Sequence, residues 1–124
     1  ESIIRDRTFY TYEARAAHTG VLFGRGVTAL ITVSDLQALG AFHSITSMGL
    51  SVPADVSVIG FDDSFLMSHL SPGLTTVHQP VPAIVTAAVR NLFEALATPD
   101  YTPEHADYVF SPDLVVRGTT AHAR

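Results

Sequence analysis

Two pairs of polar residues follow short apolar runs in this sequence, and their side chains are suited to holding a ligand by hydrogen bonds. Asp62 and Asp63 follow a β-branched run, and Ser34 and Asp35 follow a similar run at residues 28–33. A carboxylate accepts hydrogen bonds from ligand hydroxyls, and a serine hydroxyl both donates and accepts. The alternative is purely local, because Asp62 and Asp63 can cap a turn and Ser34 and Asp35 can cap a helix.

The runs before these pairs predict neighbouring strands of a parallel sheet. Residues 28–33 and 56–59 are short and rich in β-branched residues, and residues 35–48 between them predict a helix that ends at Gly49. Strand, helix and strand form a right-handed βαβ unit. Ligands of open α/β sheets collect beyond the carboxyl ends of the strands. We therefore expect Ser34 and Asp62 to share one edge of the sheet, about 5 Å apart at the backbone.

The rest of the chain predicts further α/β elements. The apolar positions of the central helix are Leu36, Leu39, Ala41, Phe42, Ile45 and Met48. We expect helices at 10–23 and 82–97, a helical turn at 64–71, strands at 74–77, 107–110 and 114–117, and a loop at 98–106. Pro82 suits the first turn of its helix.

The composition narrows the class of protein. The chain has 124 residues, 47% of them hydrophobic and 15% charged, with a net charge of −5. These values predict a single globular body without the basic surface of a nucleic-acid-binding domain. The absence of cysteine excludes disulfides and thiolate metal sites and fits a reducing compartment. No apolar run is long enough to span a membrane.

We predict a binding protein without catalytic residues, metal or cofactor. The six histidines lack metal-ligand spacing, and neither a G-x-S-x-G motif nor a glycine-rich phosphate loop occurs. Gln79, in a predicted crossing segment, carries an amide suited to recognising hydroxyls, although a solvated loop residue is an equal alternative. Leu39, Phe42 and Leu70 belong to stretches more apolar than one sheet face needs, which indicates either core packing or a subunit interface.

Four motifs in order give the chain a specific resemblance. They are residues 28–41 around Ser34-Asp35, residues 52–63 (VPADVSVIGFDD), residues 74–80 (LTTVHQP) and residues 114–120 (LVVRGTT). Together they resemble the LacI/GalR (lac-repressor-like) family of bacterial transcriptional regulators. The resemblance runs from about residue 10 onward.

This resemblance implies a fold and a domain organisation. The fold is a periplasmic-binding-protein-like (type I) parallel sheet flanked by helices, present here as a C-terminal subdomain fragment. Residues 1–79 are expected to form most of the C-terminal effector-binding subdomain, and residues 106–124 its closing strands and tail. Residues 80–105 correspond to a crossover helix of the N-terminal subdomain. We expect this helix, lacking that subdomain, to pack back, swap or pair between chains.

The resemblance also implies residue roles. Asp62 corresponds to an effector-binding acid, and Ser34, with Asp35, falls where the family usually has an Asn-Asp pair. Gln79 falls where a crossover residue often reaches the effector. Leu39, Phe42 and Leu70 are assigned to a dimer interface.

The implied function is effector binding and dimerisation in a cytoplasmic, homodimeric regulator. The effector would be a sugar or a related small polar metabolite. Operator DNA would be bound only through an N-terminal helix-turn-helix that this sequence lacks. The alternative is the solute-binding module of a sugar transport system, which has the same fold. A secretion signal upstream would favour the transport module, and a helix-turn-helix upstream would favour the regulator.

Overall fold

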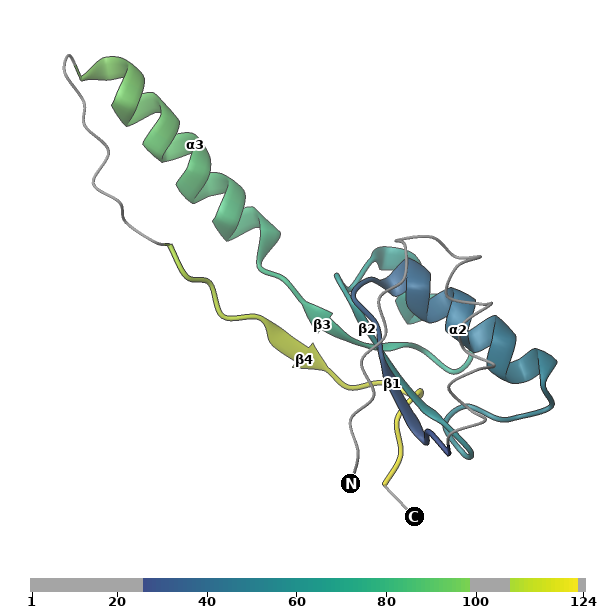
Figure 1. The fold of residues 1–124 in the computed structure, drawn as a ribbon. Coiled ribbons are helices and arrows are strands. Elements are labelled where there is room, and N and C mark those ends of the chain that lie inside the picture. The colour runs from purple at the N-terminus through teal and green to yellow at the C-terminus, as the bar shows by residue number, and fades with distance from the viewer. Residues whose placement is uncertain (1–25, 99–107, 123–124) are drawn as a thin grey trace. The chain divides into compact units, whose positions relative to one another are not determined.

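A computed structural model describes residues 26–98 and 108–122, which fall into two compact units. The first unit contains the described residues up to His78 together with those from Leu114 onward, and the second runs from Gln79 to Asp113. Along the chain the elements are β1 (Ala29–Ile31), α2 (Asp35–Ser47), β2 (Ser57–Phe61), the 3₁₀ helix η1 (Phe65–His69), β3 (Thr75–His78), α3 (Val81–Ala97) and β4 (Asp113–Val115) (Figure 1). The expected helix at 10–23 and most of the expected loop at 98–106 lie outside the described residues.

The sheet has the strand order β1-β2-β3-β4. β1 and β2 are parallel with Ile31 opposite Ile59, and β2 and β3 are parallel with Phe61 opposite Val77. The βαβ prediction is thus confirmed, although β1 is shorter than the predicted strand at 28–33. β4 lies at the far edge and returns in the opposite direction beside β3 (Figure 1). This parallel arrangement brings the carboxyl ends of β1, β2 and β3 to one edge.

Helix α2 covers one face of the sheet and forms the core with it. Ala38, Ala41 and Ile45 of α2 are fully buried and pack with Leu30, Val58 and Leu74, which are buried from the sheet side. The helix ends where predicted, with Gly49 at a φ of 76° that favours glycine. Its apolar positions are not all buried, because Leu36 and Met48 are 51% and 44% exposed. The apolar part of the buried side consists instead of small residues and Ile45, which allow the helix to approach the sheet closely, and the polar Asp35 and Gln37 are buried with them.

The segment after β4 completes the sheet through side chains as well as backbone. The Val58 amide donates to the Thr119 carbonyl (2.8 Å), and the Thr119 hydroxyl donates to the Val58 carbonyl (2.7 Å). The same hydroxyl accepts the Thr75 amide (2.8 Å). Thr119 therefore fills the position beside β2 just before β3 begins. The strand predicted at 114–117 is observed as β4 at Asp113–Val115. It therefore ends two residues earlier than predicted, and Arg117 lies outside it.

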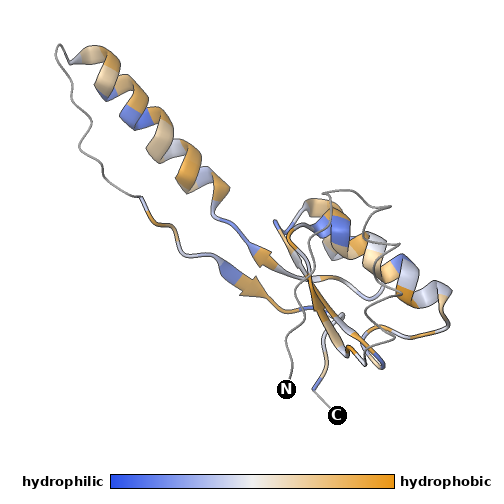
Figure 2. Ribbon diagram, viewed as in Figure 1, coloured by the Kyte–Doolittle hydropathy of each residue, from blue (hydrophilic) through white to orange (hydrophobic). Residues whose placement is uncertain are grey.

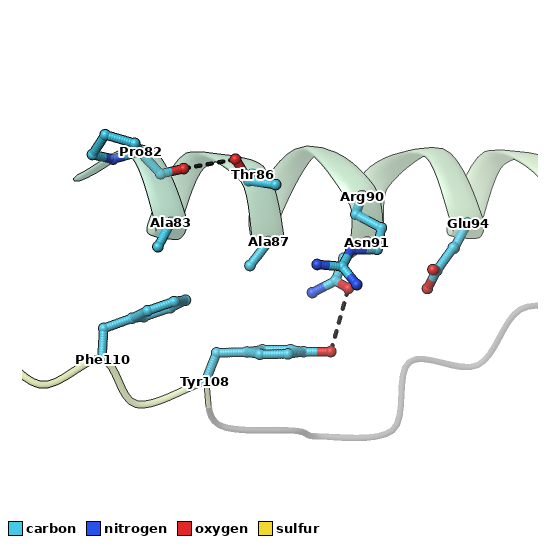
Figure 3. Close-up of a pocket in the computed structure, with 9 residues that line it drawn as sticks. All are labelled: Pro82, Ala83, Thr86, Ala87, Arg90, Asn91, Glu94, Tyr108 and Phe110. Atoms are coloured by element: carbon cyan, nitrogen blue, oxygen red, sulfur yellow. Dashed lines mark hydrogen bonds between the residues drawn. The ribbon is translucent and has the colours of Figure 1, made fainter. Parts of the chain in front are cut away.

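The second unit is built on α3, as predicted for residues 82–97. Pro82 lies in its first turn, and none of its residues is buried. Figure 2 shows that many of its residues are hydrophobic. The strand predicted at 107–110 is wrong for residues 108–110, which are irregular. Tyr, Val and Phe favour strands, but no strand of the described chain pairs with them here, and Tyr108 and Phe110 lie against α3 instead (Figure 3).

Two features are absent from the described residues. No helix among residues 26–98 and 108–122 has the length and apolarity needed to cross a membrane. Over the same ranges, no cluster of three or more His, Asp or Glu side chains is arranged to hold a metal ion.

Candidate functional site

The carboxyl edge of β1, β2 and β3 gathers most of the polar residues predicted from the sequence. Ser34 lies after β1 and is half-buried, and Asp62 lies directly after β2 and is exposed. The backbone joins these strand ends, because the Thr32 amide donates to the Ile59 carbonyl and the Asp62 amide donates to the Val77 carbonyl, each at 2.9 Å. The predicted shared edge is therefore observed, and it leaves Asp62 accessible to a ligand.

The backbone of Asp62 and Asp63 is strained. Their φ angles are 110° and 53°, and they are the only non-glycine residues of the described chain with positive φ. Such conformations cost about 1–3 kcal/mol each and persist only where the surrounding structure holds them in place. They occur often at ligand sites, where they aim a side chain that a relaxed turn would direct elsewhere.

Asp63 has two basic partners and is largely enclosed. One of its carboxylate oxygens accepts a hydrogen bond from Arg117 Nη2 at 2.6 Å, and the other lies 3.1 Å from His78 Nδ1. Arg117 Nη1 also donates to the Leu74 carbonyl at 2.8 Å. The charge of Asp63 is therefore balanced within the protein, and the exposed Asp62 lies beside it in the chain.

Asp35 is buried, with only 2% of its surface exposed. Its Oδ1 accepts the Thr76 hydroxyl at 2.6 Å, and its Oδ2 accepts both the amide (2.7 Å) and the hydroxyl (2.9 Å) of Ser64. Asp35 also lies in the first turn of α2, where the helix dipole favours a carboxylate. The structure thus places Asp35 beneath the edge rather than on it.

Ser34 is the N-cap of α2, as predicted. Its Oγ accepts the Gln37 amide at a long 3.3 Å. The capping alternative is therefore realised, and the half-buried hydroxyl still has a proton to donate.

The remaining predicted residues lie elsewhere. Gln79 directly follows β3 but begins the second unit, and it is half-buried. Leu39 and Leu70 are partly buried against the core, and Phe42 is half-buried on α2. The core-packing alternative thus accounts for part of the surface of Leu39 and Leu70, and part of each stays accessible.

Four residues of the edge were not singled out from the sequence: Ser64, Thr76, His78 and Arg117. Thr76 and His78 lie in the motif at 74–80 and Arg117 in the motif at 114–120, but neither motif indicates a partner. The one local signal is the polar pair Thr75-Thr76 between Leu74 and Val77 of the predicted strand, because polar side chains buried in a sheet require hydrogen-bond partners.

The second unit has a hollow of its own. It has a volume of about 630 Å³ and lies between α3 and residues 108–110. In Figure 3, Phe110 and Tyr108 face the helix near Ala83, Ala87 and Asn91, and the Tyr108 hydroxyl donates to Asn91 Oδ1 at 3.3 Å. None of the predicted site residues lines it.

Comparisons with known proteins agree with this architecture. The profile of a periplasmic binding protein-like domain matches residues 3–120. The HTH-type transcriptional regulator MalR of Streptomyces coelicolor is 48% identical over 124 residues, which cover 99% of this chain and 35% of that protein. This chain belongs to the LacI/GalR family of transcriptional regulators. It spans about a third of the length of the first curated relatives.

Solved structures of transcriptional regulators share the fold. The transcriptional regulator CelR in complex with cellobiose is 32% identical, with a TM-score of 0.80 over 90% of this chain and 34% of that chain. The regulator CcpA of Lactococcus lactis is 26% identical, with a TM-score of 0.82 over 96% of this chain and 45% of that one. The relatives are regulators, which favours that interpretation over the transport module. The chain thus corresponds to part of a LacI/GalR effector-binding domain with a periplasmic-binding-protein-like fold.

Proposed function

We propose that this chain binds a small hydroxylated effector at the carboxyl edge of its sheet, with Asp62 as the principal acceptor. The observation that carries the proposal is an exposed carboxylate on a strained backbone at the end of β2, beside a neighbouring acid whose charge is already balanced. A neutral polyol supplies hydroxyl donors that match such an acceptor. Since CelR binds cellobiose and is 32% identical, we infer a sugar as the ligand class.

Ser34 and Gln79 are proposed as supporting contacts. The Ser34 hydroxyl has a donor left after capping α2, and the Gln79 amide can both donate and accept. Serine is shorter than the asparagine usual in the family, so we expect a ligand that extends closer to α2. Following the family organisation, we assign residues 1–79 and 106–124 to the effector-binding subdomain and residues 80–105 to the crossover helix of the other subdomain.

Titration calorimetry with cellobiose, maltose and D-ribose tests the site in the full-length protein encoded by the gene. We expect Asp62→Ala to weaken binding about tenfold or more, because a hydrogen bond to a charged group contributes about 1.5–3 kcal/mol. The matched control is Asp55→Ala, which removes an exposed carboxylate at the opposite end of β2. Unchanged affinity in Asp62→Ala, with a sugar still bound, would remove Asp62 from the site.

The whole regulator is proposed to act in the cytoplasm as a homodimer on operator DNA, through a helix-turn-helix outside this chain. It would bind its effector without chemical change. Leu39, Phe42 and Leu70 are proposed as interface residues, because each keeps partly accessible apolar surface. Sedimentation of Phe42→Asp tests the interface, and a dimer of unchanged stability would exclude Phe42 from it.

A further inference from the structure

The buried Asp35 carboxylate is held by hydroxyls and an amide rather than by a cation. Its hydrogen-bond donors are Thr76 Oγ1, Ser64 N and Ser64 Oγ, at 2.6–2.9 Å. The ion pairs found within the described ranges both involve Asp63, so no described arginine or histidine pairs with Asp35. A buried carboxylate requires such donors, because an unpaired charge in the interior is costly.

These donors connect Asp35 to the residues that follow Asp62. Ser64 lies two residues beyond Asp62, and Thr76 Oγ1, besides donating to Asp35, accepts the Asp63 amide at a long 3.4 Å. The two residues immediately after Asp62 are therefore both connected to Asp35, one directly and one through Thr76. The strained φ of 110° at Asp62 is held between this anchor and the end of β2.

The Asp35 carboxylate also has little room to move. A Cβ atom built on Gly60 would clash with Asp35 Oδ1 and would lie 2.8 Å from Leu74 Cδ2. The carboxylate therefore lies directly against the β2 backbone, on the residue that precedes Phe61 and Asp62. Its own backbone is fixed in the capped first turn of α2.

We propose that Asp35, with Thr76 and Ser64, is a positioning group that holds the turn at residues 61–64 in the conformation that presents Asp62. Asp35 acts through these residues and does not itself contact the ligand, because it is 2% exposed and both its oxygens already accept hydrogen bonds. The role of the turn in ligand binding rests on the proposed function. The proposal that Asp35 holds the turn in its conformation is independent of that function.

Hydrogen exchange measured by NMR on the ligand-free full-length protein tests this control. Thr76→Val removes the hydroxyl and keeps the side-chain shape, and Thr76→Ser keeps the hydroxyl. We expect the amides of Asp62 and Ser64 to exchange about tenfold faster in Thr76→Val and to return close to wild type in Thr76→Ser. Neither amide loses its own acceptor, since these are Val77 O and Asp35 Oδ2. Faster exchange of these two amides would therefore report that the turn opens more often.

Two comparisons separate this effect from general destabilisation. The Val58 amide, bonded to Thr119 in the same sheet, reports opening of the sheet as a whole. The control variant Thr46→Val removes an exposed hydroxyl from the far end of α2. If Asp62 and Ser64 exchange no faster than Val58 does in Thr76→Val, the proposal is overturned. Should Thr76→Val not fold, Ser64→Ala replaces it, because this exposed residue loses one donor to Asp35 and keeps its amide.

A double-mutant cycle with cellobiose and D-ribose as probes connects the turn to binding. If Thr76 acts through Asp62, Thr76→Val weakens binding about tenfold in the wild type and has little effect in Asp62→Ala. Equal effects in both backgrounds would show that Thr76 does not act through Asp62 and would overturn its role in binding. If neither sugar binds, the proposed ligand class fails while the exchange result still decides the proposal about the turn.

Discussion

The two units of this chain use apolar residues in opposite ways. In the first unit, the apolar residues that α2 buries are small ones and Ile45, whereas the large Leu36, and Met48 at the C-cap, are exposed. In the second unit, α3 buries no residue, although it is the more clearly amphipathic helix. Its exposed apolar positions are Val81, Val85, Val89, Leu92, Phe93 and Leu96.

The large exposed apolar residues of α3 lie opposite the side that Tyr108 and Phe110 face. Ala83 and Ala87 face these aromatic residues (Figure 3), while Val81, Val85 and Val89 are each two positions away along the helix. Two positions correspond to about 200° around an α-helix. The two units show that the spacing of apolar residues predicts which side of a helix can be buried. Whether that side is buried depends on what the rest of the chain packs against it.

The largest contrast is expected for truncation of one apolar residue in each unit. Ile45→Ala removes a fully buried side chain, and we expect it to lower the free energy of unfolding by about 3 kcal/mol. Leu96→Ala removes a side chain that is 74% exposed, and we expect a change below about 0.5 kcal/mol. Urea denaturation of the 124-residue chain at two protein concentrations measures both. Equal losses would mean that the apolar side of α3 is covered in solution, as the packing, swapping or pairing expected for this helix would require.

Introducing a larger side chain should also change stability by different amounts in the two units. Gly60→Ala places a methyl group against Asp35 and Leu74, and we expect a loss of about 2 kcal/mol from overpacking. Ala88→Leu adds a larger group on the exposed surface of α3, where leucine is a good helix former, and should change stability by less than about 0.5 kcal/mol. Thermal unfolding followed by circular dichroism measures both. A tolerated Gly60→Ala would show that the edge of the sheet has more room than the structure indicates.

The smallest expected difference in stability between the two units concerns the loss of an arginine. Arg117→Met leaves the partly buried Asp63 without its arginine and the Leu74 carbonyl without its donor, so we expect a loss of about 1–2 kcal/mol. Arg90→Met on exposed α3 should cost less than about 0.5 kcal/mol. Adding Asp63→Asn to Arg117→Met should recover part of the loss, because the unpaired charge is then removed. Equal losses for the two arginine variants, measured by urea denaturation, would contradict the difference between the units.

What was predictable from the sequence was local, or followed from local elements by a general rule. The β-branched run before Asp62, the Ser34 cap and Gly49 each act within a few residues, and parallel pairing then placed Ser34 and Asp62 on one edge. The contacts of Thr76 with Asp35 and of Arg117 with Asp63 join residues 41 and 54 positions apart, and no local pattern encodes them. At residues 108–110 the local pattern was misleading, because it predicted a strand. These strand-forming side chains lack a neighbouring strand within the described chain.

The position of Thr119 has a consequence for synthesis on the ribosome. The residue that bonds both the amide and the carbonyl of Val58 is translated sixty-one residues after Val58 itself. Until it emerges from the exit tunnel, the interior strand of the nascent domain has an open edge, which can pair with another chain. We therefore expect this domain to complete its folding only after residues 114–120 are translated, and we expect chaperones that shield open strands to improve its yield.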